Sequence, residues 1–189
     1  MEQLQGKKVA VLVTDGFEQA ELLGPRQALE AAGVKVDVIS NKRGQVQGFQ
    51  HTDKGEAVAV DKTFAEADAE DYDAVVLPGG VVNGDAMRMI PEAIDFVQVA
   101  DEEDKPIAVI CHGGWLLISA DLASGRTVTS WPSLQDDFRN AGSNWVDQEV
   151  VCDGNLITSR KPDDIPAFNQ QLLSALGRQG AAGLNASRA

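Results

Sequence analysis

The chain has little of what several common classes of protein need. It carries two cysteines and two histidines, too few for a disulfide framework or for a transition-metal site built on several histidines. Lys and Arg number 16 against 29 Asp and Glu, a formal net charge of −13, whereas phosphate-binding surfaces need basic side chains. Its apolar runs fall short of the ~20 residues of a membrane-spanning helix. We therefore expect no specific nucleic-acid partner, no membrane partner, no metal and no cofactor.

The same scarcity bears on location and domain organisation. Residues 1–8 are polar and contain no apolar core of a signal peptide, and two cysteines suit a reducing compartment in which a thiol stays free. We expect a cytoplasmic protein. The 189 residues, 43% of them hydrophobic, suit one globular unit. We predict a single domain over residues 1–177 and a disordered tail, rich in Ala and Gly, over 178–189.

Short apolar runs alternate with longer segments of helical spacing. The runs predict strands at 8–13, 34–39, 74–77 and 106–110, and the longer segments predict helices at 18–32, 83–103 (broken at Pro91), 115–122 and 163–176. Two segments, 43–60 and 148–159, have the turn residues of antiparallel hairpins. Short, nearly all-apolar strands are typical of a parallel sheet covered on both faces. The pattern predicts an α/β fold, a three-layer α/β/α sandwich with a mostly parallel sheet and a small antiparallel excursion.

The segment 108–117 carries the chemistry, because it runs from a buried strand into a helix through Cys111, His112 and Gly113. A nucleophile at such a sharp turn is held at the carboxyl edge of the sheet. The following helix N-terminus would lower the pKa of the thiol, and Gly113 permits the tight backbone. The alternative interpretation is that Cys111 is a small core residue, as free cysteines often are. We interpret Cys152, in the middle of a strand, as structural.

Three further positions could complete a site. Gly79 and Gly80 follow a predicted strand, so their N–H groups could form an oxyanion hole with that of His112, or they could be an ordinary turn. Glu18 lies just beyond the first strand and could share a proton with Cys111, although its spacing from the preceding aspartate also fits a helix-capping box. The His112 side chain could act as a base if a carboxylate orients it, or be a solvated turn histidine.

Two familiar catalytic arrangements are not supported. No histidine follows His112, which argues against a glutaminase-type triad whose histidine lies far downstream of the cysteine. The sequence also has no GxSxG motif, so a serine hydrolase is not indicated.

Several ordered motifs resemble one family nearly end to end. They are VAVLVTDGFEQAEL at 9–22, VVLPGG at 75–80, AVICHGGWLLISADLASGR at 108–126, DDFRNAGSNWVDQEVV at 136–151 and TSRKPDDIPAFNQQLL at 158–173. With them the chain resembles the ThiJ/PfpI superfamily, in its intracellular protease I and general-stress-protein branch. The resemblance implies a flavodoxin-like, class I glutamine amidotransferase-like sandwich.

The same resemblance implies roles for single residues. Cys111 would be the nucleophile, Glu18 its hydrogen-bonding partner and His112 its neighbour, with an oxyanion site from the backbone near Gly80. In this branch the acid that orients the histidine can come from another subunit. Asp85 matches that acid if one residue is inserted before it, so a homodimer or higher homo-oligomer is expected.

One departure from the family pattern concerns the pocket. The family usually has Cys-His-Gly-Pro, whereas Gly114 is followed here by Trp115, whose indole would narrow the pocket. We expect this change to affect substrate preference.

Three functions remain in view. The first is a cysteine-dependent hydrolase that acts on a peptide or on a small carbonyl compound of the glyoxal type. The second is a redox-sensing or chaperone-like stress protein with an oxidisable Cys111. The third, a ligand-binding module without catalysis, would need a phosphate-binding loop, for which Gly79 and Gly80 are the single candidate.

Overall fold

A seven-stranded sheet forms the centre of the computed structural model, which describes residues 4–186. Its strand order is β11-β12-β8-β7-β1-β3-β6. The bounds are β1 (Lys8–Leu12), β3 (Lys35–Ser40), β6 (Lys62–Thr63), β7 (Ala74–Leu77), β8 (Ile107–Ile110), β11 (Val150–Asp153) and β12 (Leu156–Ser159). Neighbouring strands are parallel except β11 and β12, which form the hairpin predicted around Gly154. The carboxyl ends of β1, β7 and β8 therefore meet at one edge.

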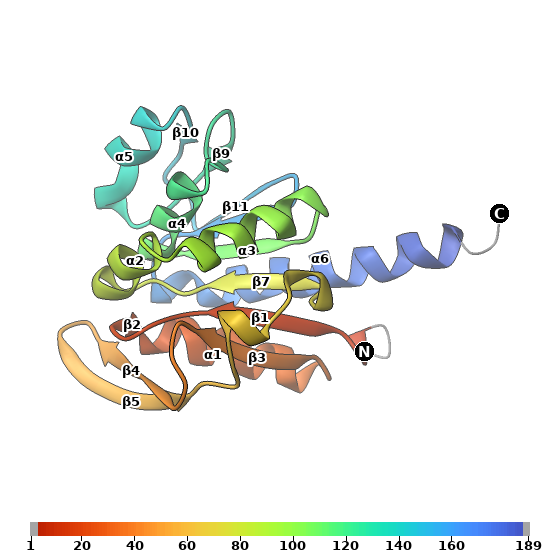
Figure 1. The fold of residues 1–189 in the computed structure, drawn as a ribbon. Coiled ribbons are helices and arrows are strands. Elements are labelled where there is room, and N and C mark those ends of the chain that lie inside the picture. Colours follow the sequence, from red (N-terminus) through yellow and green to blue (C-terminus); the bar gives the residue numbers. More distant parts are fainter. Residues whose placement is uncertain (1–3, 187–189) are drawn as a thin grey trace.

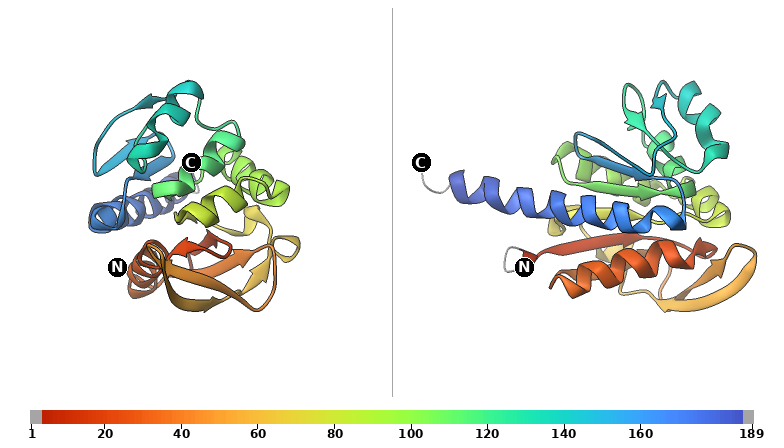
Figure 2. Two further views of the ribbon diagram at one scale, coloured as in Figure 1. Left: turned by 90° about the vertical axis from the view of Figure 1, so that its left-hand side faces the viewer. Right: turned by 180° about the vertical axis from the view of Figure 1, so that it is seen from behind.

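Helices cover both faces of this sheet. Helices α1 (Gln19–Ala31) and α6 (Ile165–Ala186) lie on one face, and α3 (Pro91–Glu102) and α4 (Gly114–Ser119) on the other (Figures 1 and 2). In β1, Val9 and Val11 belong to the core shared with α1 and α6. Ala10 and Leu12 belong to the core shared with α3 and α4. Because successive side chains of a strand alternate between faces, an all-apolar strand needs both layers, and the predicted three-layer fold is confirmed.

The antiparallel excursion lies outside the main sheet. Strands β4 (Gln45–Gln50) and β5 (Asp53–Ala59) form the predicted hairpin, and β4 also pairs, in parallel, with β2 (Phe17–Glu18). The connecting turn contains His51 with a φ of 57°. The hairpin lies at the same end of the molecule as α2 (Val81–Met87) (Figure 1), so its tip is close to the carboxyl edge of the sheet.

A small third unit connects α4 to β11 and was not predicted. It contains β9 (Thr127–Val128), β10 (Asn144–Trp145) and α5 (Gln135–Asn140). Its core consists of Ala123, Val128, Leu134 and Phe138. Two-residue strands and a six-residue helix are too short to give a periodic signal in the sequence. Short 3₁₀ turns complete the fold at Phe64–Glu66, Ala69–Asp71, Cys111–Gly113, Pro132–Leu134 and Pro162–Asp164.

Two predicted segments differ in detail. The region 83–103 is two helices, with Pro91 as the first residue of α3, the position where proline is best tolerated. Helix α6 continues past Gly177 to Ala186, where we predicted a disordered tail. The Ala, Leu, Gln and Arg residues of that segment favour a helix, and single glycines weaken it without ending it. The rest of the predicted tail, 187–189, lies outside the described residues.

Among residues 4–186, none of the helices combines the length and the apolar character that crossing a membrane requires.

Candidate active site

Cys111 occupies a strained turn between β8 and α4. Its φ is +61°, a left-handed conformation that costs a non-glycine residue on the order of 1 kcal/mol or more. The turn is tight because Gly113 packs on the end of β7: a Cβ there would stand 2.5 Å from the Leu77 carbonyl oxygen. The sheet edge thus holds the thiol in a fixed place, and Cys111 is 7% exposed.

Backbone and imidazole groups surround the sulfur. The N–H groups of Gly80 and His112 donate to Cys111 Sγ, and Nδ1 of His112 lies 3.2 Å from it. We predicted a part for Gly79 in the oxyanion hole, but its N–H donates to Oε2 of Glu21 at 2.8 Å. The structure therefore directs two N–H groups, not three, at the Cys111 sulfur.

The carboxyl group beside the thiol is Glu21, which corrects the prediction of Glu18. Glu21 lies in the first turn of α1 and is fully buried, and its side chain interacts with that of Cys111. A Cβ on Gly79 would stand 2.4 Å from Glu21 Oε2 and 2.6 Å from Cys111 Cβ, so a glycine is needed between them. Because Oε2 accepts the Gly79 N–H and Oε1 has no hydrogen-bond partner, Oε1 is the oxygen left to carry a proton.

Glu18 has a different place in the site. It ends β2, so its backbone is extended where that of Glu21 is helical. Glu18 Oε2 accepts the backbone N–H of His51 at 2.9 Å, which fixes the tip of the β4–β5 hairpin. Glu18 thus helps to line the cavity over Cys111 but does not partner the thiol.

Burial controls the titration of this pair. Burial raises the pKa of Glu21 to about 8, although the hydrogen bond from the Gly79 N–H lowers it in part. Burial, followed by the charge of Glu21, raises the pKa of the Cys111 thiol as well. We expected the helix N-terminus to lower it, but α4 spans six residues and its dipole is too small to offset desolvation. Glu21 and Cys111 therefore both keep their protons at neutral pH, and a thiolate could form only if a base removed the thiol proton.

His112 is the group placed to do so. It is buried, and burial lowers its pKa, so the imidazole is neutral at pH 7 and its Nδ1 can accept a proton. Within the described chain no carboxylate bonds to it; Asp85 lies exposed on α2 and does not contact the ring. Instead the ring lies between two indoles, with centroids 5.1 Å from Trp115 and 5.9 Å from Trp131.

These groups face a cavity of about 530 Å³. Its lining is acidic and aromatic, with contributions from β2, the β4–β5 turn, the elbow and the third unit. The described residues that line it are Glu18, Glu21, His51, Thr52, Gly80, Val81, Cys111, His112, Trp115, Trp131, Ser133 and Pro162. Lys and Arg are missing from this lining, so the cavity offers no permanent positive charge to an anion. Among residues 4–186, no cluster of His, Cys, Asp and Glu side chains is suited to hold a metal ion.

Asn83 organises the loops around the site, and we did not predict it. It is 1% exposed on α2. Its Oδ1 accepts the Thr14 N–H at 2.8 Å, while its Nδ2 donates to the carbonyls of Pro78 and Gly79 at 3.0 Å. This one amide joins the loop after β1 to the loop after β7. A polar residue in an otherwise apolar segment, Val81-Val82-Asn83, is the signal that could have shown it.

The raised pKa of Glu21 predicts an unusual dependence of stability on pH. Glu21 has a pKa of about 8 when folded and 4.5 ordinarily, so the folded state binds its proton more tightly. Its contribution to stability is complete below pH 4.5 and is lost as pH rises to about 8, with a slope approaching about 1.4 kcal/mol per pH unit. The lowered pKa of His112 acts in the opposite sense below its ordinary value of about 6.5.

Denaturant unfolding between pH 6.5 and 8 isolates this effect of Glu21. Wild type should lose stability with rising pH, and Glu21→Gln should be nearly flat, because the amide does not titrate. Glu18→Gln is the matched control, since it removes a carboxyl group from the same cavity and leaves the Glu21 carboxyl in place; it should keep most of the wild-type slope, because the charge of Glu18 raises the pKa of Glu21 less than burial does. Parallel curves for wild type and Glu21→Gln would contradict the assignment.

Comparison with known proteins agrees with the fold and the motifs. A model of the DJ-1/PfpI family matches residues 7–175. General stress protein 18 of Bacillus subtilis (strain 168) is 40% identical over 173 residues, covering 90% of this chain and 98% of that protein. Protein/nucleic acid deglycase 2 of Escherichia coli (strain K12) is 42% identical over 174 residues, covering 90% and 98%.

A solved structure agrees as well. The two-domain protein from Anabaena variabilis ATCC 29413, with DJ-1/ThiJ/PfpI-like and ferritin-like domains, superposes with a TM-score of 0.86 at 39% identity. The superposition covers 90% of this chain and 48% of that one. The family expected from the sequence is thus confirmed, and the chain belongs to the DJ-1/PfpI family.

Proposed function

We propose that this protein is a cysteine-dependent hydrolase that removes dicarbonyl adducts of the methylglyoxal type, with Cys111 as the nucleophile. One observation carries the proposal: Cys111 stands at a strained elbow beneath the cavity, with two N–H groups on its sulfur and a neutral imidazole 3.2 Å away. A core cysteine needs none of these. The name of the Escherichia coli relative, a deglycase, supports the same class of reaction.

The site can perform each chemical step with its own groups. His112 Nδ1 takes the thiol proton, and the thiolate adds to the aldehyde carbon, giving a hemithioacetal. The N–H groups of Gly80 and His112 can stabilise the negative oxygen. The Glu21 carboxyl can give its proton to this oxygen, and its carboxylate can then take the proton from the former aldehyde carbon and deliver it to the neighbouring carbonyl carbon, which leaves a thioester once the hydroxyl proton has passed to the neighbouring oxygen. Water then releases lactate and the free thiol, so methylglyoxal plus water gives lactic acid.

The cavity favours a small carbonyl compound over a long peptide. Its volume is about 530 Å³, and the β4–β5 tip and Pro162 both lie on its wall. A small aldehyde, free or carried on a side chain, fits such a space, whereas an extended peptide needs a groove or an open strand edge. Peptide hydrolysis remains the second activity within the same class of mechanism.

The test follows lactate formation from methylglyoxal by proton NMR. Wild type should form lactate, and alkylation of Cys111 to one equivalent, checked by the mass of its peptide, should abolish it. Cys152 is exposed, so a sample alkylated at that position alone serves as the control and should keep its rate. Lactate formation that survives full modification of Cys111, or none by the intact protein above the buffer rate, would overturn the proposal.

The redox-sensing alternative has weaker support. The donors from Gly80 and His112 would bind the oxygens of an oxidised sulfur. Rapid oxidation, however, requires an accessible thiolate, and Cys111 is 7% exposed with its pKa raised by burial and Glu21. The hydrolase therefore stands first.

Assembly belongs to the same proposal. Val81, Val82 and Met89, on or next to α2, are large hydrophobic side chains that are 55%, 64% and 77% exposed, and Asp85 is exposed among them. Exposed apolar side chains gathered in one place are typical of interaction surfaces. We propose that copies of the chain associate, at least as a homodimer, and that Asp85 acts across that contact.

A further inference from the structure

The imidazole of His112 is held by aromatic contacts on two sides. The Trp131 indole lies nearly parallel to it, at 28° and a centroid distance of 5.9 Å. The Trp115 indole meets it edge to face, at 66° and 5.1 Å. Rotation of the ring would break both contacts and carry Nδ1 away from Cys111 Sγ, now at 3.2 Å. The two indoles thus define one ring orientation, the one in which Nδ1 reaches the sulfur.

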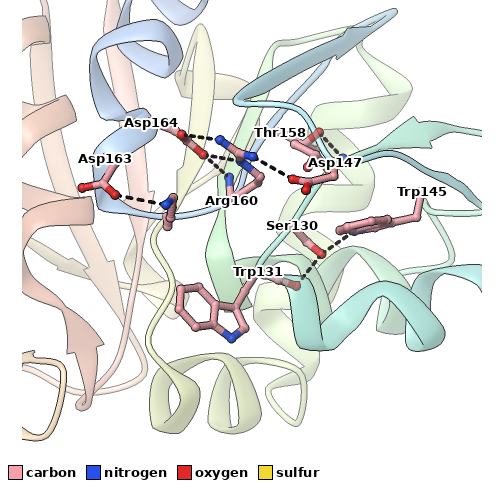
Figure 3. A network of polar contacts seen from close by, with 10 residues as sticks. Ser130, Trp131, Trp145, Asp147, Thr158, Arg160, Asp163 and Asp164 are labelled. Atoms are coloured by element: carbon pink, nitrogen blue, oxygen red, sulfur yellow. Dashed lines mark hydrogen bonds and ion pairs between the residues drawn. The ribbon is translucent and has the colours of Figure 1, made fainter.

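Trp131 is held through its backbone, which leaves its indole free to face His112. Its carbonyl accepts the Ser130 hydroxyl at 3.0 Å, and Ser130 Oγ accepts Nε1–H of Trp145 at 2.9 Å. Arg160 donates to Asp147 at 2.7 Å, tying down the chain just after Trp145. In Figure 3 the indole of Trp131 points away from this network. The network therefore positions the residue without using its ring.

Trp115 is held through its own side chain. Its Nε1–H donates to Asp137 Oδ2 at 2.9 Å. The Arg88 guanidinium lies over its ring, 5.7 Å from the centroid, and Nε of Arg88 donates to the Ser119 hydroxyl at 3.1 Å. Trp115 thus supplies one half of the enclosure around His112.

We propose that Trp115 and Trp131 are positioning residues that, in the absence of a carboxylate from the same chain, hold His112 neutral and oriented toward Cys111. The inference rests on the proposed function in taking His112 as the proton acceptor. A carboxylate orients a catalytic histidine by a hydrogen bond to its second nitrogen and favours its charged form. The indoles restrict the ring by packing and favour its neutral form by excluding water.

The charged groups around His112 are few and can be separated by mutation. Cys111 is in contact with its Nδ1, Glu18 and Glu21 face the same cavity, and Arg88 lies behind Trp115. None of these changes in a variant of Trp131. A shift in the pKa of His112 on removal of that indole therefore reports the loss of its shielding.

Trp131 is the position to change first, because it is 36% exposed and its truncation should not unfold the protein. The chain has two histidines, so the ring signal of His112 can be assigned in NMR spectra with His51→Gln. In Trp131→Ala its pKa should rise toward the ordinary value of about 6.5, and in Trp131→Phe it should stay near wild type. Trp115→Phe should likewise retain the lowered pKa, and Trp115→Ala should not.

Kinetics distinguish positioning from substrate contact. Each alanine variant should lower kcat for methylglyoxal, and the rate of Cys111 alkylation at pH 7, by about three- to tenfold, the range set by one aromatic contact. KM should change less than about twofold, and phenylalanine should restore most of the rate. Cys152→Ser changes an exposed side chain outside the cavity and should match wild type.

A higher KM with unchanged kcat would overturn the inference, because the indoles would then bind substrate. An unchanged pKa of His112 in both alanine variants would overturn it as well. The titration and the alkylation rate require no turnover, so they decide on the positioning role even if methylglyoxal proves not to be a substrate.

Discussion

Replacement of Cys111 by serine is expected to lower kcat/KM for methylglyoxal by at least about a thousandfold, the scale seen when a covalent nucleophile is removed. A hydroxyl is far less acidic than a thiol, so the neutral His112 imidazole, itself a weak base because burial lowers its pKa, cannot generate the alkoxide. The substitution is small and leaves the N–H groups of Gly80 and His112 in place. The loss would therefore be one of chemistry and not of binding.

The measurement is lactate formation under saturating and limiting substrate, with Cys152→Ser as the matched control. Cys152 is exposed on β11, and its thiol lies 3.6 Å from the Gln171 amide oxygen. It does not line the cavity over Cys111, so the Cys152→Ser variant should stay within about twofold of the wild-type rate. Thermal unfolding of both variants shows whether they are folded. A Cys111→Ser protein that is folded and keeps a tenth of the activity would mean that the sulfur does not attack the substrate.

Replacement of Gly80 by alanine is expected to cost on the order of 4 kcal/mol or more of folding stability. Gly80 precedes α2 with φ 89° and ψ 129°, a conformation closed to other residues. An added Cβ would stand 2.3 Å from the Gly16 carbonyl oxygen, 2.7 Å from Glu18 N and 2.8 Å from Phe17 Cα. All three are backbone atoms, so no side chain can move aside.

Gly125→Ala is the matched control for this clash. Gly125 also has a positive φ, +75°, but a Cβ there would meet nothing within 4 Å, so its cost should be the conformational one, about 1–2 kcal/mol. Urea unfolding of the two variants separates strain from collision. Equal losses would show that the loop after β7 can move away from the loop after β1, and that the oxyanion donor at Gly80 is not fixed.

The main sheet and its helices could be predicted because their signals are long or strongly patterned. β7 and β8 are unbroken apolar runs, β1 and β3 are apolar in large part, and α1 and α6 have helical spacing of leucines. The unit around α5 could not be predicted, since its elements of two to six residues bury at most one side chain each. The pairing of β4 with β2 was missed for a similar reason, because a two-residue strand carries no pattern of its own.

The site was predicted to within one helical turn. The elbow at Cys111 follows from a buried strand that runs into glycines, but the choice between Glu18 and Glu21 depends on where α1 begins. Glu21 lies in phase with the buried Pro25 and Leu29, so a carboxylate on the apolar stripe was the available signal. Trp131 and His51 enter the cavity from segments whose positions depend on tertiary packing alone.

The left-handed backbone at Cys111, with φ +61°, sets stability against activity at a single position. Glycine would adopt this conformation without strain, so the substitution that most relaxes the chain there is one that deletes the proposed nucleophile. Selection for folding stability alone would therefore favour loss of this cysteine, and selection for catalytic activity would retain it. Efforts to make the protein more heat-resistant should seek gains elsewhere, because relief of strain at the elbow trades directly against turnover.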